Sequence, residues 1–188
     1  MQVLKFGGTS VASAEAMLQT TNIIKKALQE DRTLVVSSAI SGCTDKLNGI
    51  GKLAAARDEA CREELKALQE RHHVIIEKLL PTGYRNKTLQ AVDGLFSELE
   101  SIVQGVYLVG ELSPTSLSAV ESFGELLSTR ILTDQFLSRG IACRCLDARE
   151  LVVTREGVVD TAETYRRIAD ALQQHVHAEL FLAPGFKL

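Results

Sequence analysis

The first ten residues carry residue types that can bind and neutralise an anionic group. Lys5 lies in an apolar run that predicts a buried strand, and Gly7, Gly8, Thr9 and Ser10 follow before helical spacing begins. Glycine permits positive φ and lets backbone N–H groups approach a ligand, and a following helix adds the positive end of its dipole. The lysine precedes the glycines, unlike the order in a Walker A loop. This pattern favours a phosphate or carboxylate site; the alternatives are a purely structural turn and a Lys5 side chain that extends from an edge strand to water.

Two glutamates further along the chain form a second candidate site. Glu121 and Glu125 lie one turn apart on a helix that we expect to begin at Ser113 and Pro114, a good N-cap and a good first helical residue. Carboxylates at this spacing repel each other by about a few tenths of a kcal/mol. A bound ammonium group between them would remove that repulsion. The alternative is a solvent-exposed helix face.

The histidines and cysteines give no comparable pattern. No cysteine or carboxylate completes a ligand set beside the paired histidines, so we predict no metal site. The four cysteines are too few and too irregularly spaced for a disulfide framework, and we expect them to be reduced and unreactive. The residues concerned are His72, His73, His175, His177, Cys43, Cys61, Cys143 and Cys145.

The composition is that of an ordinary globular protein. Its 188 residues, 45% of them hydrophobic and 24% charged, suffice for one domain or for part of a larger one. A formal net charge of −3 argues against a nucleic-acid or anionic-membrane partner. No apolar run approaches the roughly 20 residues that span a bilayer, and no signal peptide is recognisable. We therefore expect a soluble protein in a reducing cytoplasm.

Strand and helix patterns alternate and predict an α/β protein. Two units of strand, small-residue turn and helix open the chain, and a parallel sheet with crossover helices accommodates them most simply. From about 46 to 110 the pattern is helical, and residues 81–83 divide it into a hairpin that we expect to stand off the sheet. The other predicted elements are helices at 11–30, 113–140 and 161–174, the last opened by a capping box of Asp160 and Glu163, and strands at 33–38, 141–147, 151–154 and 179–183.

Four stretches resemble, in order and spacing, the motifs of aspartate kinases in the amino-acid kinase superfamily. They are residues 5–11 (Lys-Phe-Gly-Gly-Thr-Ser-Val), 36–45, 122–128 with its Gly-Glu-x-x-Ser pattern, and 183–186 (Ala-Pro-Gly-Phe). The resemblance spans the whole chain. It implies a three-layer α/β/α amino-acid-kinase-like fold with a mainly parallel sheet and a helical hairpin insertion. The long middle and residues 108–110 look more like the kinase part of bifunctional aspartokinase–homoserine dehydrogenases.

The resemblance also implies an activity, the phosphorylation of L-aspartate by ATP with Mg²⁺ in lysine, threonine and methionine biosynthesis. Lys5 would stabilise the phosphoryl group in flight while the Gly7 and Gly8 amides cradle it. The implied ATP or phosphate side is Lys5, Gly7, Gly8, Thr9, Ser10 and Ser38, and the implied amino-acid side is Ala39, Thr44 and Glu125, with Glu125 close to the ammonium group. A different acceptor, such as glutamate, N-acetylglutamate or a nucleotide, and a non-catalytic ligand-binding module are the alternatives.

One departure from the family pattern qualifies the activity. Complete members continue into a second glycine-rich stretch with an arginine for the substrate α-carboxylate, and then into the nucleotide-binding half of the sheet. Residues 1–188 contain none of these parts. We therefore expect this chain to be the amino-terminal, substrate-side part of a kinase domain, with a truncated fold and no activity by itself. A homo-oligomer is expected as well.

Overall fold

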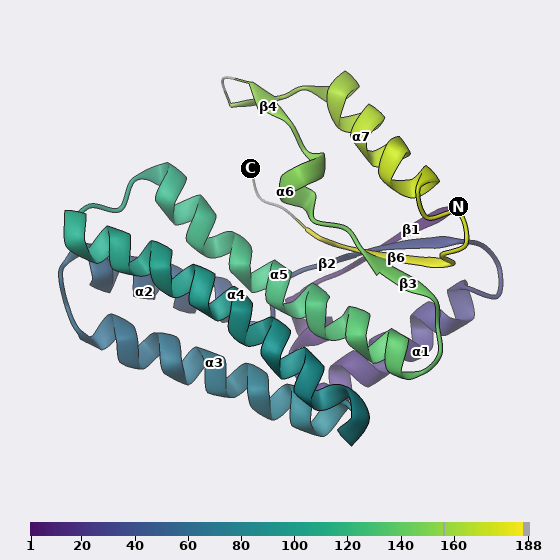
Figure 1. Ribbon diagram of the computed structural model, residues 1–188, viewed down its shortest axis with the longest axis horizontal. Coiled ribbons are helices and arrows are strands. Elements are labelled where there is room, and N and C mark those ends of the chain that lie inside the picture. The colour runs from purple at the N-terminus through teal and green to yellow at the C-terminus, as the bar shows by residue number, and fades with distance from the viewer. Residues whose placement is uncertain (156, 186–188) are drawn as a thin grey trace.

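Four parallel strands form the centre of the molecule (Figure 1). The computed structural model describes residues 1–155 and 157–185, so Phe186 of the last family-like stretch lies outside the described residues. The strand order is β1-β2-β6-β3, and each neighbouring pair is parallel. The strands are β1 (Gln2–Phe6), β2 (Thr33–Ser37), β6 (Leu180–Pro184) and β3 (Cys143–Cys145). The prediction of a mainly parallel sheet is confirmed.

The three long strands end at the same level of the sheet. Phe6 is in register with Ser37, and Ser37 is in register with Pro184. Because parallel strands run in one direction, the segments that follow them leave from the same edge. Segments 7–8, 38–39 and 185, which lie far apart in the sequence, are therefore spatial neighbours.

Five helices on one face of the sheet build the main core (Figure 1). They are α1 (Ala14–Ala27), α2 (Cys43–Ala55), α3 (Ala60–Leu79), α4 (Thr82–Val109) and α5 (Pro114–Ser138). Helix α5 packs directly on β2, β3 and β6, while α3 and α4 pack chiefly on α1, α2 and α5. The helical hairpin of the sequence analysis is thus the pair α3–α4, a second helical layer that shares one continuous apolar core with the strands.

The opposite face of the sheet has a thinner cover. It consists of α6 (Ala148–Leu151), α7 (Thr161–Gln173) and the small antiparallel hairpin of β4 (Thr154–Arg155) and β5 (Val158–Val159). A small apolar cluster of Leu146, Ala178 and Phe181 is buried there. Figure 1 shows these elements on one side of the sheet and the five long helices on the other. The three-layer arrangement is confirmed.

Both predicted helix starts are confirmed. The Ser113 hydroxyl accepts a hydrogen bond from the Ser116 N–H at 3.1 Å, with Pro114 as the first residue of α5. The Asp160 carboxylate accepts one from the Glu163 N–H at 3.1 Å and opens α7. Each side chain satisfies a backbone donor that has no partner within the helix.

Region 46–110 contains a break that the sequence pattern did not indicate. Helix α2 ends at Ala55, and Arg57 adopts a left-handed conformation with φ 56° before α3 begins. Asp58 accepts a hydrogen bond from the N–H of Ala60, the first residue of α3, at 2.9 Å. Residues 56–58 include no glycine or proline. The run of good helix formers therefore predicted a continuous helix across this break.

The strand predicted at 151–154 is wrong. Leu151 is the last residue of α6, which Asp147 caps by accepting a hydrogen bond from the Arg149 N–H at 2.9 Å. Only Thr154 lies in a strand, paired with Val159 of β5. The β-branched residues at 152–153 suggested the strand. The cap at Asp147, however, favours the helical turn of α6, which ends directly before them.

Candidate active site

The segments that follow β1, β2 and β6 are joined by backbone hydrogen bonds. The Ser38 N–H donates to Phe6 O at 3.0 Å, the Ser41 N–H to Gly8 O at 3.2 Å, and the Gly185 N–H to Ser37 O at 2.8 Å. In parallel α/β sheets, ligands bind beyond the carboxyl ends of the strands. The fold therefore places the predicted first and second turns at the edge where a ligand site is expected.

In the glycine turn after β1, Gly8 allows the backbone of the second turn to approach closely. A Cβ at Gly8 would lie 2.9 Å from Ala39 O, whereas Gly7 has open space around it. Gly7 has φ −78°, and Gly8 is not among the residues with positive φ, so the conformational freedom offered by the sequence is not used here. A left-handed glycine occurs instead in the second turn, where Gly42 has φ 75° directly before α2.

The helix dipole expected at the first turn is also displaced. A short 3₁₀ helix, η1 (Gly8–Val11), follows β1, and α1 begins only at Ala14 with Ser13 as its cap. The helix predicted from residue 11 therefore starts three residues later. Thr9 is exposed, and Ser10 is half-buried with its carbonyl accepting a hydrogen bond from Thr20 Oγ1 at 2.7 Å. The first N–H groups of a 3₁₀ turn have no partner within the turn, so they can donate to an anion.

Lys5 lies beside this turn with an exposed side chain. It is in register with Val36, on the sheet face that carries the thinner cover. Within residues 1–155 and 157–185 it forms no ion pair, so no protein carboxylate of that part of the chain neutralises it. The ammonium group is available to a ligand at the carboxyl end of the sheet.

A cavity of about 180 Å³ adjoins the second turn. The residues that line it are Ser38, Thr44, Ser118, Glu121, Ser122 and Glu125. Ser38 directly follows β2, Thr44 lies in the first turn of α2, and the other four come from α5. The structure thus brings together three residues predicted for the site, Ser38, Thr44 and Glu125. Hydroxyls and carboxylates in one small cavity suit a polar ligand that carries a cationic group.

The Gly-Glu-x-x-Ser pattern explains why α5 lies against this cavity. A Cβ at Gly124 would lie 2.9 Å from the Ala39 Cβ and 3.3 Å from Cys43 Sγ, so only glycine lets the helix approach the second turn this closely. Ser128 Oγ then donates a hydrogen bond to Ser38 O at 2.7 Å. Ala39 is buried in this contact and does not line the cavity. Glycine and serine together set the position of Glu125.

Three residues of the site were not found from the sequence. Asn48 Nδ2 donates to Glu121 Oε1 at 3.0 Å from α2, and the hydroxyls of Ser118 and Ser122 complete the cavity. Gly185 also lies close, because a Cβ there would be 3.7 Å from Glu125 Oε1. Serines one helical turn apart on the glutamate side of α5 were the only available signal. Asn48 had none, since its role depends on how two helices pack.

Comparison with known proteins identifies the family. A model described as the amino acid kinase family matches residues 1–187. The chain belongs to the amino acid kinase family. Bifunctional aspartokinase/homoserine dehydrogenase 1 (chloroplastic) of Arabidopsis thaliana is 28% identical over 189 residues, which are 98% of this chain and 20% of that protein. Aspartokinase 3 (chloroplastic) of the same plant is 33% identical over 153 residues, 79% of this chain and 26% of that protein.

Solved structures agree with this amino acid kinase assignment. Escherichia coli aspartokinase III in complex with aspartate and ADP superimposes with a TM-score of 0.84 at 27% identity, over 98% of this chain and 40% of that one. The same enzyme with lysine and aspartate gives a TM-score of 0.81 at 26% identity, over the same shares of the two chains. The predicted fold and the resemblance to aspartate kinases are confirmed. Relatives with and without a dehydrogenase both match, so the fusion stays a prediction.

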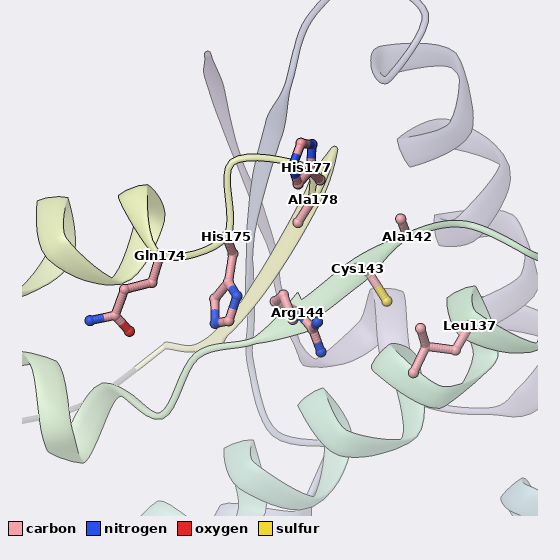
Figure 2. Close-up of a pocket in the computed structure, with 8 residues that line it drawn as sticks. All are labelled: Leu137, Ala142, Cys143, Arg144, Gln174, His175, His177 and Ala178. Atoms are coloured by element: carbon pink, nitrogen blue, oxygen red, sulfur yellow. The ribbon is translucent and has the colours of Figure 1, made fainter.

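This amino acid kinase chain has a second cavity of about 340 Å³, and Figure 2 shows its lining residues. Its lining residues come from β3, from the end of α5 and from the segment after α7: Leu137, Ala142, Cys143, Arg144, Gln174, His175, His177 and Ala178. It borders the amino ends of β3 and β6, opposite the edge at which parallel sheets bind ligands. Its greater size therefore does not make it the better candidate.

The thiols are poor nucleophiles. Burial raises the pKa of Cys43, beside the first cavity, to about 12, and that of Cys143 in the second cavity to about 12. Both stay protonated at neutral pH, and the thiolate is the reactive form. No group of three or more potential metal ligands occurs among the described residues, and within the same residues no helix is long and apolar enough to cross a bilayer.

Proposed function

We propose that this chain is the substrate-side part of an aspartate kinase, which transfers the terminal phosphoryl group of ATP to the β-carboxylate of L-aspartate. The observation that carries the proposal is the small cavity of Thr44, Glu121 and Glu125, set beside the Lys5 turn at the carboxyl edge of a parallel sheet. The family assignment and the aspartate kinase neighbours support it. The chain spans 20% and 26% of its two named relatives, so the activity belongs to a longer protein.

The chemistry needs charge neutralisation more than proton transfer. The β-carboxylate of aspartate has a reference pKa of about 3.9 and is already ionised at pH 7. It needs no general base, but it is repelled by the phosphates of ATP. An exposed lysine and backbone N–H groups aimed at the transferring group lower that barrier by stabilising its negative charge. In this proposal the negative charge is stabilised by Lys5 and by the backbone N–H groups of Gly7 and Gly8. The phosphate side is lined by Thr9, Ser10 and Ser38.

The amino acid would be held from the other side. Glu125 accepts hydrogen bonds from its ammonium group, and the Thr44 hydroxyl and the N-terminal turn of α2 face its carboxylates. Ala39 shapes this side from below, through its contact with Gly124. Because Ser128 and Gly124 fix α5 on the second turn, the two halves of the site are held at a set separation before substrate binds.

ATP would enter as the second substrate. No cluster of three or more potential metal ligands occurs among the described residues. Mg²⁺ commonly retains several waters and binds through substrate phosphates with one or two carboxylates, and we propose that it arrives with ATP. A homo-oligomer and a cytoplasmic location remain part of the proposal, the latter supported by four free cysteines.

An acceptor screen of the full-length protein that carries this chain tests the proposal. Coupled ADP release should require L-aspartate and should be absent with glutamate, N-acetylglutamate or a nucleotide as acceptor. The isolated residues 1–188 should show no turnover in the same assay. ADP release with another acceptor, but not with aspartate, would show that the protein is a kinase with a different substrate. No ATP-dependent turnover with any acceptor would favour a non-catalytic binding module.

A further inference from the structure

We propose that Glu121 is a second carboxylate for the ammonium group of the bound amino acid, and that Asn48 holds it in position. The inference rests on the proposed function, because it concerns the same cavity and assumes an amino-acid substrate. It adds a specificity residue outside the Gly-Glu-x-x-Ser pattern, one helical turn ahead of Glu125.

Position is the first support. Glu121 and Glu125 are four residues apart on α5, so their side chains lie on one face of the helix, and both line the 180 Å³ cavity. Glu121 is half-buried rather than solvated. The sequence left open the alternative that both glutamates lie on a solvent-exposed helix face. Their partial burial beside the cavity excludes it.

The contact with Asn48 is the second support. The Asn48 amide comes from α2 and donates to Glu121 Oε1 at 3.0 Å. A carboxylate has roughly four acceptor sites on its two oxygens, so this bond fixes the orientation of the group and leaves acceptor capacity for the cavity. The amide is neutral and does not cancel the charge of Glu121.

The donor and acceptor count of the cavity is the third support. No lysine or arginine among the described residues lines it; its other lining groups are the hydroxyls of Ser38, Thr44, Ser118 and Ser122. An ammonium group has three donors. Two carboxylates and one of these hydroxyls can accept all three, which makes the site selective for a ligand with a free amino group.

Steady-state kinetics of the full-length protein with L-aspartate and ATP test this. Glu121→Gln keeps an oxygen for Asn48 and removes only the charge. We expect the KM for aspartate to rise about tenfold, as for loss of a charged hydrogen bond, while kcat and the KM for ATP stay within about twofold. Asn48→Ala should act in the same direction, by about threefold. Glu77→Gln, at an exposed position of α3, is the matched control and should leave all three constants unchanged.

An unchanged KM for aspartate in Glu121→Gln would overturn the inference. So would equal increases in both KM values, because these would indicate a merely structural contact between α2 and α5. In either case aspartate phosphorylation by the unmodified protein would leave the proposed function intact. If the unmodified protein does not phosphorylate aspartate, both proposals fail.

Discussion

The two ends of the parallel sheet differ in how tightly their surroundings are built. At the carboxyl end, hydrogen bonds of 2.8–3.2 Å join three chain segments, and Gly8 and Gly124 each allow an approach at which a Cβ would be 2.9 Å from its neighbour. At the amino end, a three-residue strand, β3, borders a cavity of about 340 Å³ beneath the end of α7. The smaller cavity has the more constrained walls.

This difference shows that constraint, rather than volume, marks the candidate site. Catalysis needs groups fixed in position before the substrate arrives, and close packing through glycine is a way to fix them. The thin layer has a small apolar cluster, and exposed ion pairs of Glu163 with Arg166 and Arg167 lie within α7. Pairs of this kind add little stability. Substitutions at the two ends should therefore have unequal effects on activity and on stability.

The largest effect is expected from Lys5→Ala in the full-length protein. Loss of the exposed Lys5 ammonium group beside the first turn should lower kcat for aspartate phosphorylation about 10²- to 10³-fold. The unfolding temperature should hardly change, since the side chain is exposed. Coupled ADP release measures this, with Lys25→Ala on the exposed face of α1 as the control. A Lys5→Ala enzyme with near-normal kcat would remove the first turn from the site.

A pair of glycine substitutions tests the close approach directly. Gly124→Ala places a Cβ against the rigid Ala39 Cβ and should destabilise the fold by about 1–3 kcal/mol. Gly94→Ala lies in α4 with open space around it and should stabilise by about 0.5–1 kcal/mol, because alanine favours a helix. Chemical denaturation of both variants gives the comparison.

The two glycine variants should also separate in their kinetics. Gly124→Ala should raise the KM for aspartate, because it displaces Glu125 from the second turn, whereas Gly94→Ala should not. Equal stability of the two variants would mean that α5 can move away from Ala39 without cost, contrary to the constraint inferred here.

The smallest effect is expected at the thin layer. Hydrogen bonds from Arg166 and Arg167 lower the pKa of Glu163 to about 2, from an ordinary 4.5. A carboxylate with a lowered pKa in the folded state stabilises it above the ordinary pKa and loses that contribution as the pH falls towards the lowered value. Glu163→Gln should therefore weaken hydrogen-exchange protection of α7 slightly at pH 7.

The same comparison at lower pH supplies the control. The ratio of protection between the unmodified protein and Glu163→Gln should fall towards one as the pH decreases from about 4.5 to about 2. A ratio that does not depend on pH would show that the ion pairs contribute nothing to α7. Aspartate kinetics should be the same in both proteins.

Much of the site edge could be predicted because its signals are local. The Lys5 turn and the Ser113 and Asp160 caps depend on residues within a few positions of one another, and the alternation of strand and helix patterns predicted the parallel sheet. Such short-range chemistry is legible in a single sequence.

The remainder depends on contacts between distant segments. Arg57 holds its left-handed turn where its guanidinium lies 3.1 Å from a Cβ built on Gly110, and neither residue reveals the other. The contact of Asn48 with Glu121 joins positions 73 apart in the sequence. Gly124 was predicted only as part of the Gly-Glu-x-x-Ser pattern, because its closeness to Ala39 exists only once α5 has packed on the second turn.

The most direct test of the central claim is the affinity of the full-length protein for L-aspartate, measured by calorimetry before and after Glu125→Gln. If the cavity between α2 and α5 holds the amino acid, the dissociation constant should rise about tenfold or more, with that of ATP unchanged. Equal aspartate affinity in the two proteins would contradict the account and place the amino acid elsewhere.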